Sequence, residues 1–277
     1  MKKILVPCDF SRPAINAYRF ALNIASRSGG TVHLLYVVEL PVMHDPLLMP
    51  VLSIEQDYMD DLKAKSEKNF QKLVEKHKVK GVKVKTEVVF GPVTRMVIDY
   101  ADTKTADVII MGSHGASGVR EFFVGSNAEK IVRTSPVPVF VLKDLYDDQI
   151  ERMVFPYATE TDDQKSFVTK VTQLQKFFKA HIDLVWINTP GVFYRDIDMT
   201  KRMSAFAKRY RLKNYTIHIF NDLNEREGII NFTGAINGDL IVMGTHGRKG
   251  IVHLLSGSVT ESVVNHVKWP IWTCVVK

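Results

Sequence analysis

Short apolar runs alternate with amphipathic segments along the first half of the chain. The run from Ile4 to Cys8 is followed by Ser11-Arg12-Pro13, which is typical of a helix N-cap with a proline just inside the helix. Apolar residues then recur at helical spacing until Gly29-Gly30 ends the helix. The same alternation predicts strands at 31–38, 82–89, 108–111 and 137–142, and helices at 54–78, 93–103 and 126–134.

The second half of the chain repeats this order of elements. Strands are predicted near Met153, Leu184, Thr216, Leu240 and Ile271, with helices between them. Nearly continuous apolar strands that alternate with helices are typical of a parallel sheet covered on both faces. The pattern therefore predicts an α/β fold of two tandem, doubly wound, five-stranded parallel-sheet domains, which bind ligands beyond the carboxyl ends of the strands.

Comparison of the chain with itself supports a duplication. Residues 106–115 match residues 238–247, and the glycines, serine and proline that follow keep the same spacing. The first strands correspond at a larger offset, so the second copy lacks about 17 residues between its first and fourth strands. We assign this difference to an insertion in the first copy, from Pro41 to about Asp61, and place the domains at 1–144 and 150–277.

A glycine-rich segment follows the fourth predicted strand of each copy. In the first copy it is Gly112-Ser113-His114-Gly115, with Gly125-Ser126 at the start of the next helix. Glycines permit positive φ angles and let phosphate oxygens approach backbone N–H groups, and a helix N-terminus favours an anion. An ordinary turn with a serine N-cap is the alternative. The same spacing recurs in the second copy and favours a phosphate site; the residues there are Gly244, Gly247, Gly257 and Ser258.

Charge and composition narrow the classes of function. The chain has 277 residues, a net charge of +7 and 45% hydrophobic residues, as expected for a soluble globular protein. It has neither an apolar stretch of membrane-spanning length nor a basic stripe interleaved with aromatic residues, so we expect no membrane and no nucleic-acid partner. The first residues run directly into a strand, and we expect a cytoplasmic protein without a signal peptide.

Catalytic and metal-binding patterns are weak. Cys8 and Cys274 match no metal spacing, and we expect both to be buried thiols. His114 and His246 have no second ligand at metal spacing and are interpreted as hydrogen-bond partners, so no metal site is predicted. The sequence contains no Walker motif, which argues against fast phosphoryl transfer, and we assign no catalytic residue.

The glycine spacing resembles that of a known family. Gly112-x2-Gly115-x9-Gly125-Ser126 is similar to the phosphate-binding signature of the universal stress protein family, and the segment from Gly244 to Ser258 matches it again. The chain start, residues 4–11, also resembles the first strand and turn of that family. The resemblance covers almost the whole chain as a tandem pair of domains with the adenine nucleotide alpha hydrolase-like fold.

This resemblance implies a site for ATP, or for AMP or ADP. In the family, the aspartate after the first strand, here Asp9, lines the adenosine site, and backbone near Val37 contacts the adenine. The glycine segment holds the phosphates, often with a divalent ion such as Mg²⁺ carried on the phosphates. The complete set of expected nucleotide-binding residues is Pro7, Asp9, Val37, Met111, Gly112, His114, Gly115, Gly125, Ser126 and Asn127.

Family members commonly dimerise through the last strand, so a homo-oligomer is also expected. In a tandem chain, the strands at 137–142 and 271–276 can instead pair with each other, because an apolar sheet edge must be covered. The second copy departs from the family pattern, since Tyr157 falls on Cys8 and Ala158 falls on Asp9. That copy binds a different ligand, binds weakly, or serves as a structural partner.

Three functions remain open. We favour an ATP-binding universal stress protein with a sensing or stress-response role, which acts on an unidentified downstream protein. The first alternative is an enzyme of the adenine nucleotide alpha hydrolase type that hydrolyses ATP slowly or transfers AMP. The second alternative is an interaction module in which both sites are degenerate.

Overall fold

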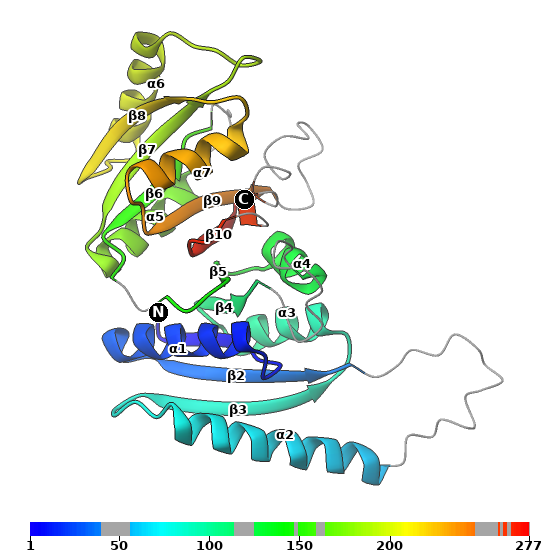
Figure 1. Ribbon diagram of the computed structural model, residues 1–277. Helices are drawn as coiled ribbons and strands as arrows, with labels where there is room; N and C mark the ends of the chain where they lie inside the picture. Colours follow the sequence, from blue (N-terminus) through cyan, green and yellow to red (C-terminus); the bar gives the residue numbers. More distant parts are fainter. Residues whose placement is uncertain are drawn as a thin grey trace, which may run out of the picture.

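All described strands belong to one ten-stranded sheet, with helices on both faces (Figure 1). The computed structural model describes residues 1–39, 56–113, 125–146, 149–158, 164–246, 260, 263–264 and 267–276. The strands are β1 Lys3–Pro7, β2 Thr31–Val38, β3 Lys83–Phe90, β4 Val108–Gly112, β5 Val139–Leu142, β6 Arg152–Pro156, β7 His181–Asn188, β8 Tyr215–Asn221, β9 Leu240–His246 and β10 Ile271–Val276. The helices are α1 Arg12–Ser28, α2 Gln56–Lys76, α3 Val93–Thr103, α4 Ser126–Thr134, α5 Lys165–Phe178, α6 Asp196–Arg209 and α7 Glu225–Ala235.

The strand order β3-β2-β1-β4-β5-β10-β9-β6-β7-β8 contains the same doubly wound unit twice. In the first half of the chain, β1 lies between β2 and β4, and in the second half β6 lies between β7 and β9. The chain therefore reverses its winding direction at β1/β4 and again at β6/β9, which are the points where such sheets bind ligands. This arrangement confirms the predicted fold class.

The two halves also share their local hydrogen bonding. Asp107, just before β4, accepts bonds from backbone N–H groups at the start of β1, and Asp239, just before β9, accepts bonds at 2.9 and 2.8 Å from N–H groups at the start of β6. These equivalent carboxylates fix the register of the two central strand pairs. The two halves are thus built on one pattern, as the sequence comparison indicated.

The halves are joined through their last strands. β5 and β10 pair antiparallel, with Trp272 opposite Phe140, whereas the other strand pairs are parallel. Trp272 is fully buried and stacks on Phe167 with 6.1 Å between the ring centroids. The expectation that the two last strands pair within one chain is confirmed.

Local sequence accounts well for most helices. The Ser11 side chain accepts a bond from the Ala14 N–H at 3.4 Å, and Gly29 ends α1 with φ 61°. α3 and α4 begin and end at the expected residues. The length difference between the halves does lie between the second and third strands, but part of it is helical, because α2 has 21 residues and α6 has 14.

Two apolar cores lie on opposite faces of the sheet. One packs α1, α2, α5 and α6 against the strands, and the other packs α3, α4 and α7. Both cysteines are free and buried, as expected. Within the described ranges, no helix is both long and apolar enough to cross a membrane.

Candidate functional site

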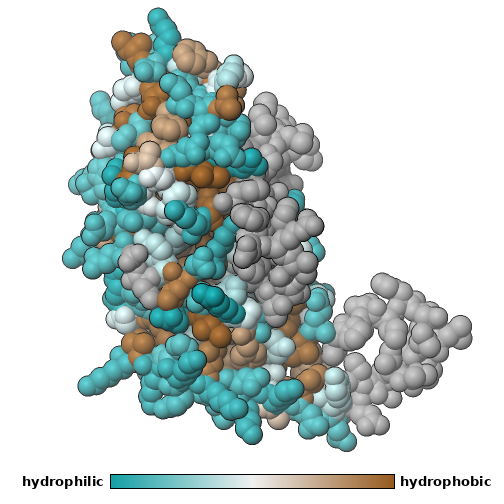
Figure 2. All heavy atoms as spheres, in the orientation of Figure 1, coloured by the Kyte–Doolittle hydropathy of each residue, from teal (hydrophilic) through white to brown (hydrophobic). Residues whose placement is uncertain are grey.

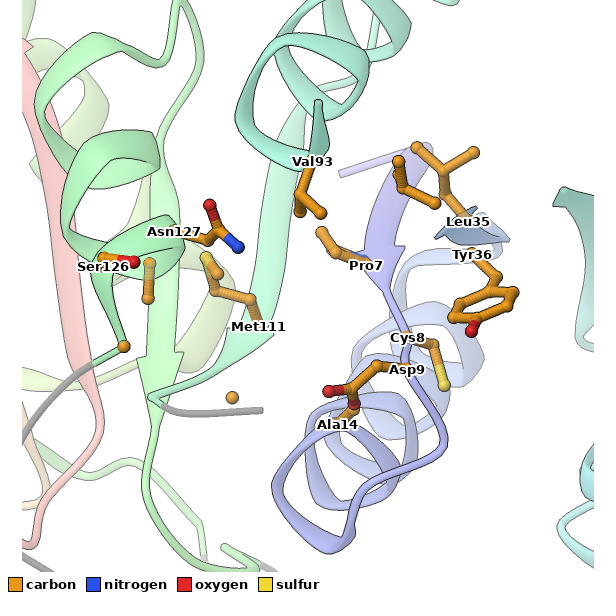
Figure 3. Close-up of a pocket in the computed structure, with 14 residues that line it drawn as sticks. Pro7, Cys8, Asp9, Ala14, Leu35, Tyr36, Val93, Met111, Ser126 and Asn127 are labelled. Atoms are coloured by element: carbon orange, nitrogen blue, oxygen red, sulfur yellow. The ribbon is translucent and has the colours of Figure 1, made fainter. Parts of the chain in front are cut away.

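A cavity of about 330 Å³ opens at the carboxyl ends of β1 and β4, where the winding of the first half reverses (Figure 3). The structure brings most of the expected residues to this cavity: Pro7, Asp9, Val37, Met111, Gly112, Gly125, Ser126 and Asn127. His114 and Gly115 lie outside the described residues, as do Gly247, Gly257 and Ser258 of the second half. Gly244 is the fifth residue of β9 and lies beside Cys274 of β10.

Asp9 is positioned by a tight turn between β1 and α1. Its Oδ1 accepts a bond from the Ser11 N–H at 3.1 Å, and the carboxylate is directed toward the gap between β1 and β4 (Figure 3). The intervening Phe10 has φ 64°, which is uncommon for a bulky residue. Its ring packs on Tyr36 and Phe70, with centroids 5.2 and 4.9 Å away. These aromatic contacts hold the backbone in a conformation that presents Asp9 to the cavity.

The N-terminus of α4 faces the same cavity from the other side. Gly125 is the N-cap, with φ −62° and ψ 145°, and as a glycine it has no side chain with which to cap this first turn. Ser126 is the first helical residue and its side chain is exposed, so the alternative of a serine N-cap is wrong. Because a helix N-terminus carries partial positive charge and directed N–H groups, this end of the cavity suits an anion.

Asn127 has a fixed orientation at this helix end. Its Oδ1 accepts a bond from the Thr94 hydroxyl at 3.1 Å, which ties α4 to the first turn of α3. The amide nitrogen is then directed toward the cavity (Figure 3). Asn127 therefore adds a donor beside the α4 N-terminus, and α3 adds a second helix start, whose N-cap residue Pro92 makes no side-chain capping bond.

The glycines of the site do not have the backbone conformation that the sequence suggested. Neither Gly112 nor Gly125 has a positive φ angle. A Cβ on Gly112 would lie 2.7 Å from Cβ of Pro13 and 2.8 Å from its carbonyl carbon. Gly112 is thus required for close packing of α1 on the end of β4, and the expected conformational reason is wrong for these two residues.

The sequence did not point to several other lining residues. Cys8, Ala14, Leu35, Tyr36, Val93 and Ala128 complete the lining. Val93 opens α3 directly after the third strand, so the expected fold could have placed it at the same sheet edge. Burial raises the pKa of the Cys8 thiol to about 12, and a thiol that stays protonated is a poor nucleophile.

The equivalent position in the second half is built from larger side chains. The Tyr157 N–H donates to the Val185 carbonyl at 2.7 Å, as the Cys8 N–H donates to Leu35, so Tyr157 takes the place of Cys8. Its ring lies 5.2 Å from Phe206 and 6.3 Å from Trp186. Ala158 therefore follows where Asp9 stands in the first half, and the carboxylate has no counterpart at that position.

The next strand differs as well. Trp186 donates through Nε1 to Asn188 Oδ1 at 2.8 Å, and its side chain is buried. Ile187, the counterpart of Val37, is buried against α7, where a Cβ on Gly228 would lie 2.3 Å from Ile187 Cγ2. Helix α7 thus packs directly on the residue whose counterpart lines the cavity in the first half.

A family model now connects these observations to known proteins. The model of the universal stress protein family matches residues 1–143 and 194–274. This chain belongs to the universal stress protein family. The match spans the first half from end to end but leaves out residues 144–193, which hold β6, α5 and β7 with Tyr157 and Trp186.

Individual relatives agree with a tandem member of this family. A universal stress protein of Synechocystis is 25% identical, and the alignment covers 99% of both chains. A universal stress protein of Methanocaldococcus jannaschii is 30% identical over 143 residues, which are 51% of this chain and 82% of the relative. A universal stress protein structure from Archaeoglobus fulgidus superimposes with a TM-score of 0.76 at 20% identity, covering 99% of this chain and 98% of that one.

Proposed function

We propose that the first half of the chain binds an adenine nucleotide (ATP, or AMP or ADP) in the cavity at β1 and β4. The observation that carries the proposal is the placement of Asp9 opposite the N-terminus of α4, whose N-cap is the glycine Gly125, across one cavity at the switch point of the sheet. A nucleotide needs both features, because its ribose offers hydroxyl donors and its phosphates are anions. The resemblance of the glycine spacing to the family's phosphate signature supports the same assignment.

Each part of the nucleotide has matching groups in the cavity. Asp9 accepts hydrogen bonds from the ribose hydroxyls, and the apolar side chains of Val37 and Val93 flank the adenine. The Ser126 hydroxyl, the Asn127 amide and the N–H groups of the α4 start donate to the phosphates. A Mg²⁺ ion, when present, is held by the phosphates and screens their charge.

We further propose that the protein senses or stores the nucleotide in a stress response in the cytoplasm, without fast turnover. Cys8 is the nucleophilic side chain nearest in sequence to Asp9, and its raised pKa makes it unsuitable for attack on a phosphate or acyl group. No observation of the site favours the hydrolase alternative over simple binding. The second half has no counterpart of Asp9 at β6, so we propose that each chain binds one nucleotide. We propose that the chain consists of two domains, 1–144 and 150–277, and that the second domain is a structural partner of the first.

Calorimetry on ligand-stripped protein tests the binding site. We expect Asp9→Ala to weaken ATP binding about tenfold or more, because a hydrogen bond to a charged group contributes about 1.5–3 kcal/mol. The matched control is Asp99→Ala, which removes an exposed aspartate of α3 and should leave ATP binding unchanged. Wild-type protein that binds no ATP, or an Asp9→Ala variant that binds like wild type, would overturn the proposal.

A further inference from the structure

The ten-stranded sheet ends at β3 on one side and at β8 on the other. The Ile182 N–H donates to the Asn214 carbonyl at 3.0 Å, and the Asp222 N–H donates to the Asn188 carbonyl at 2.9 Å. Because backbone groups alternate along a strand, the even-numbered residues of β8 bond to β7 and the odd-numbered ones face outward. In the described chain β8 pairs only with β7, so Ile217 and Ile219 direct their N–H and C=O groups to an open edge.

The two edges differ in how they resist pairing with another strand. β3 carries Lys83, Lys85 and Glu87 with exposed side chains, and charges of this kind block edge-to-edge association. β8 has the sequence Tyr-Thr-Ile-His-Ile-Phe-Asn, without lysine, arginine or carboxylate. The histidine of β8, His218, bonds to the buried Asp183 at 2.9 Å and packs on Phe232. The outer edge of the second half therefore lacks the charges that protect the first half.

Apolar side chains continue this edge at the carboxyl end of β8. Leu223 is 82% exposed and Phe193 is 68% exposed, and both line a shallow cleft with Asn221. Val192 and Ile197 are exposed nearby along the chain. Hydrophobic side chains reach the surface at the end of the molecule that holds α6 and β8 (Figure 2). Exposed apolar groups that gather at one place mark an interaction surface.

We propose that β8 is a dimerisation edge, which pairs antiparallel with β8 of a second copy of this chain. A strand edge with free backbone groups is completed by another strand, and antiparallel self-pairing about a two-fold axis closes the assembly at two copies. Pairing of β8 with β3 of another copy would place Lys83 and Lys85 against an uncharged strand and would leave further edges open. The chain already joins its own halves by antiparallel pairing of β5 and β10. This proposal is independent of nucleotide binding.

Hydrogen exchange on the full chain, combined with sedimentation, tests the edge directly. We expect a dimer whose population rises with concentration, and slowed exchange of the Ile217 and Ile219 amides as it forms. The Thr216 and His218 amides should stay protected at every concentration, because they bond to β7. A protein that is monomeric at all concentrations, or a dimer in which the Ile217 and Ile219 amides exchange as in the monomer, overturns the proposal.

A lysine substitution at an exposed position of β8 provides a second test that leaves the apolar core unchanged. The registers of β3 and β8 make Thr216 the counterpart of Lys85, and Thr216 is exposed. We expect Thr216→Lys to raise the dimer dissociation constant at least tenfold, with an unchanged circular dichroism spectrum. Thr169→Lys adds the same charge to an exposed position of α5 and should leave the dimer intact. Equal dimerisation of the two variants would contradict a β8 interface.

Discussion

Gly112 lies where the end of β4 meets the first turn of α1, and its lack of a side chain is what allows that contact. The sequence predicts a glycine at this position for a positive φ angle and for phosphate approach; the structure shows no positive φ angle there, and it shows a steric requirement from Pro13 that the sequence did not predict. The difference arises because Pro13 is about a hundred residues away along the chain, and sequence spacing carries no information on that contact. Gly112 therefore lines the cavity and also permits a packing contact that stabilises the fold.

We expect Gly112→Ala to destabilise the protein by about 1–3 kcal/mol, as overpacking of a tight contact does. The free energy of unfolding in urea measures this change. Gly191→Ala is the control, because a Cβ on Gly191 would meet nothing within 4 Å, and it should change stability by less than about 0.5 kcal/mol. Equal stability of the two variants would show that the Pro13 contact relaxes without cost.

Asp183 is a second residue whose surroundings decide its behaviour. It is fully buried in β7, where Arg152 donates to both carboxylate oxygens at 3.0 and 2.8 Å and His218 lies 2.9 Å away. Burial raises the pKa of this carboxyl, but the bonds from Arg152 and His218 outweigh burial and lower it below the usual value. A lowered pKa in the folded state means that the ionised group stabilises the fold above its unfolded pKa, and that this contribution is lost as the pH falls through the folded pKa.

We expect Arg152→Met to lower the free energy of unfolding at neutral pH by about 2–4 kcal/mol, because it leaves a buried carboxylate with one partner. Loss of Arg152 also raises the folded pKa of Asp183 toward or above its unfolded value, so the stability difference between wild type and variant should shrink as the pH falls from 7 to 3. Urea unfolding between pH 3 and 7 measures both effects. Arg195→Met breaks an exposed pair with Asp198 and should cost less than about 1 kcal/mol; a similar cost for both variants would contradict this account.

At the scale of elements, the helices α1 and α4 start in different ways. Ser11 caps α1 with its own side chain, whereas α4 starts at Gly125 without a side-chain cap. The start of α1 could be predicted in full, because its signals are adjacent in sequence. At α4 the order Gly-Ser is compatible with either residue as the N-cap, and only the structure shows that Gly125 is the N-cap. The Thr94–Asn127 bond and the Phe10 contacts depend on residues far apart along the chain, so no local pattern could predict them.

The two serines give a direct test of this difference. We expect Ser11→Ala to destabilise the protein by about 1 kcal/mol with ATP affinity nearly unchanged, because it removes a helix cap. Ser126→Ala should leave stability within about 0.5 kcal/mol and weaken ATP binding, because its hydroxyl caps nothing and faces the cavity. Thermal melts and calorimetry measure the two quantities. If Ser126→Ala lost stability and kept ATP affinity, the hydroxyl would have a structural role instead.

At the scale of the whole molecule, the two halves share strand order and hydrogen bonding but differ at their switch points. The doubly wound class and the β5–β10 junction were predictable, because they follow from apolar patterning and from the need to cover an edge, whereas the order of the strands within the sheet was not predicted. The presence of Tyr157, Trp186 and Ile187 at the second switch point was predictable only in part, from the loss of the aspartate. In the described residues, the first half lines a cavity at its switch point, and the second half places Tyr157, Trp186 and Ile187 at the equivalent positions.

The number of nucleotides bound per chain tests this central claim most directly. Protein saturated with ATP and freed of excess ligand is denatured, and the released adenine nucleotide is quantified against the chain concentration. We expect one nucleotide per chain in wild type and a large loss of bound nucleotide in Asp9→Ala. Two nucleotides per chain would contradict the proposal that the second half is only a structural partner, and none would contradict the site at β1 and β4.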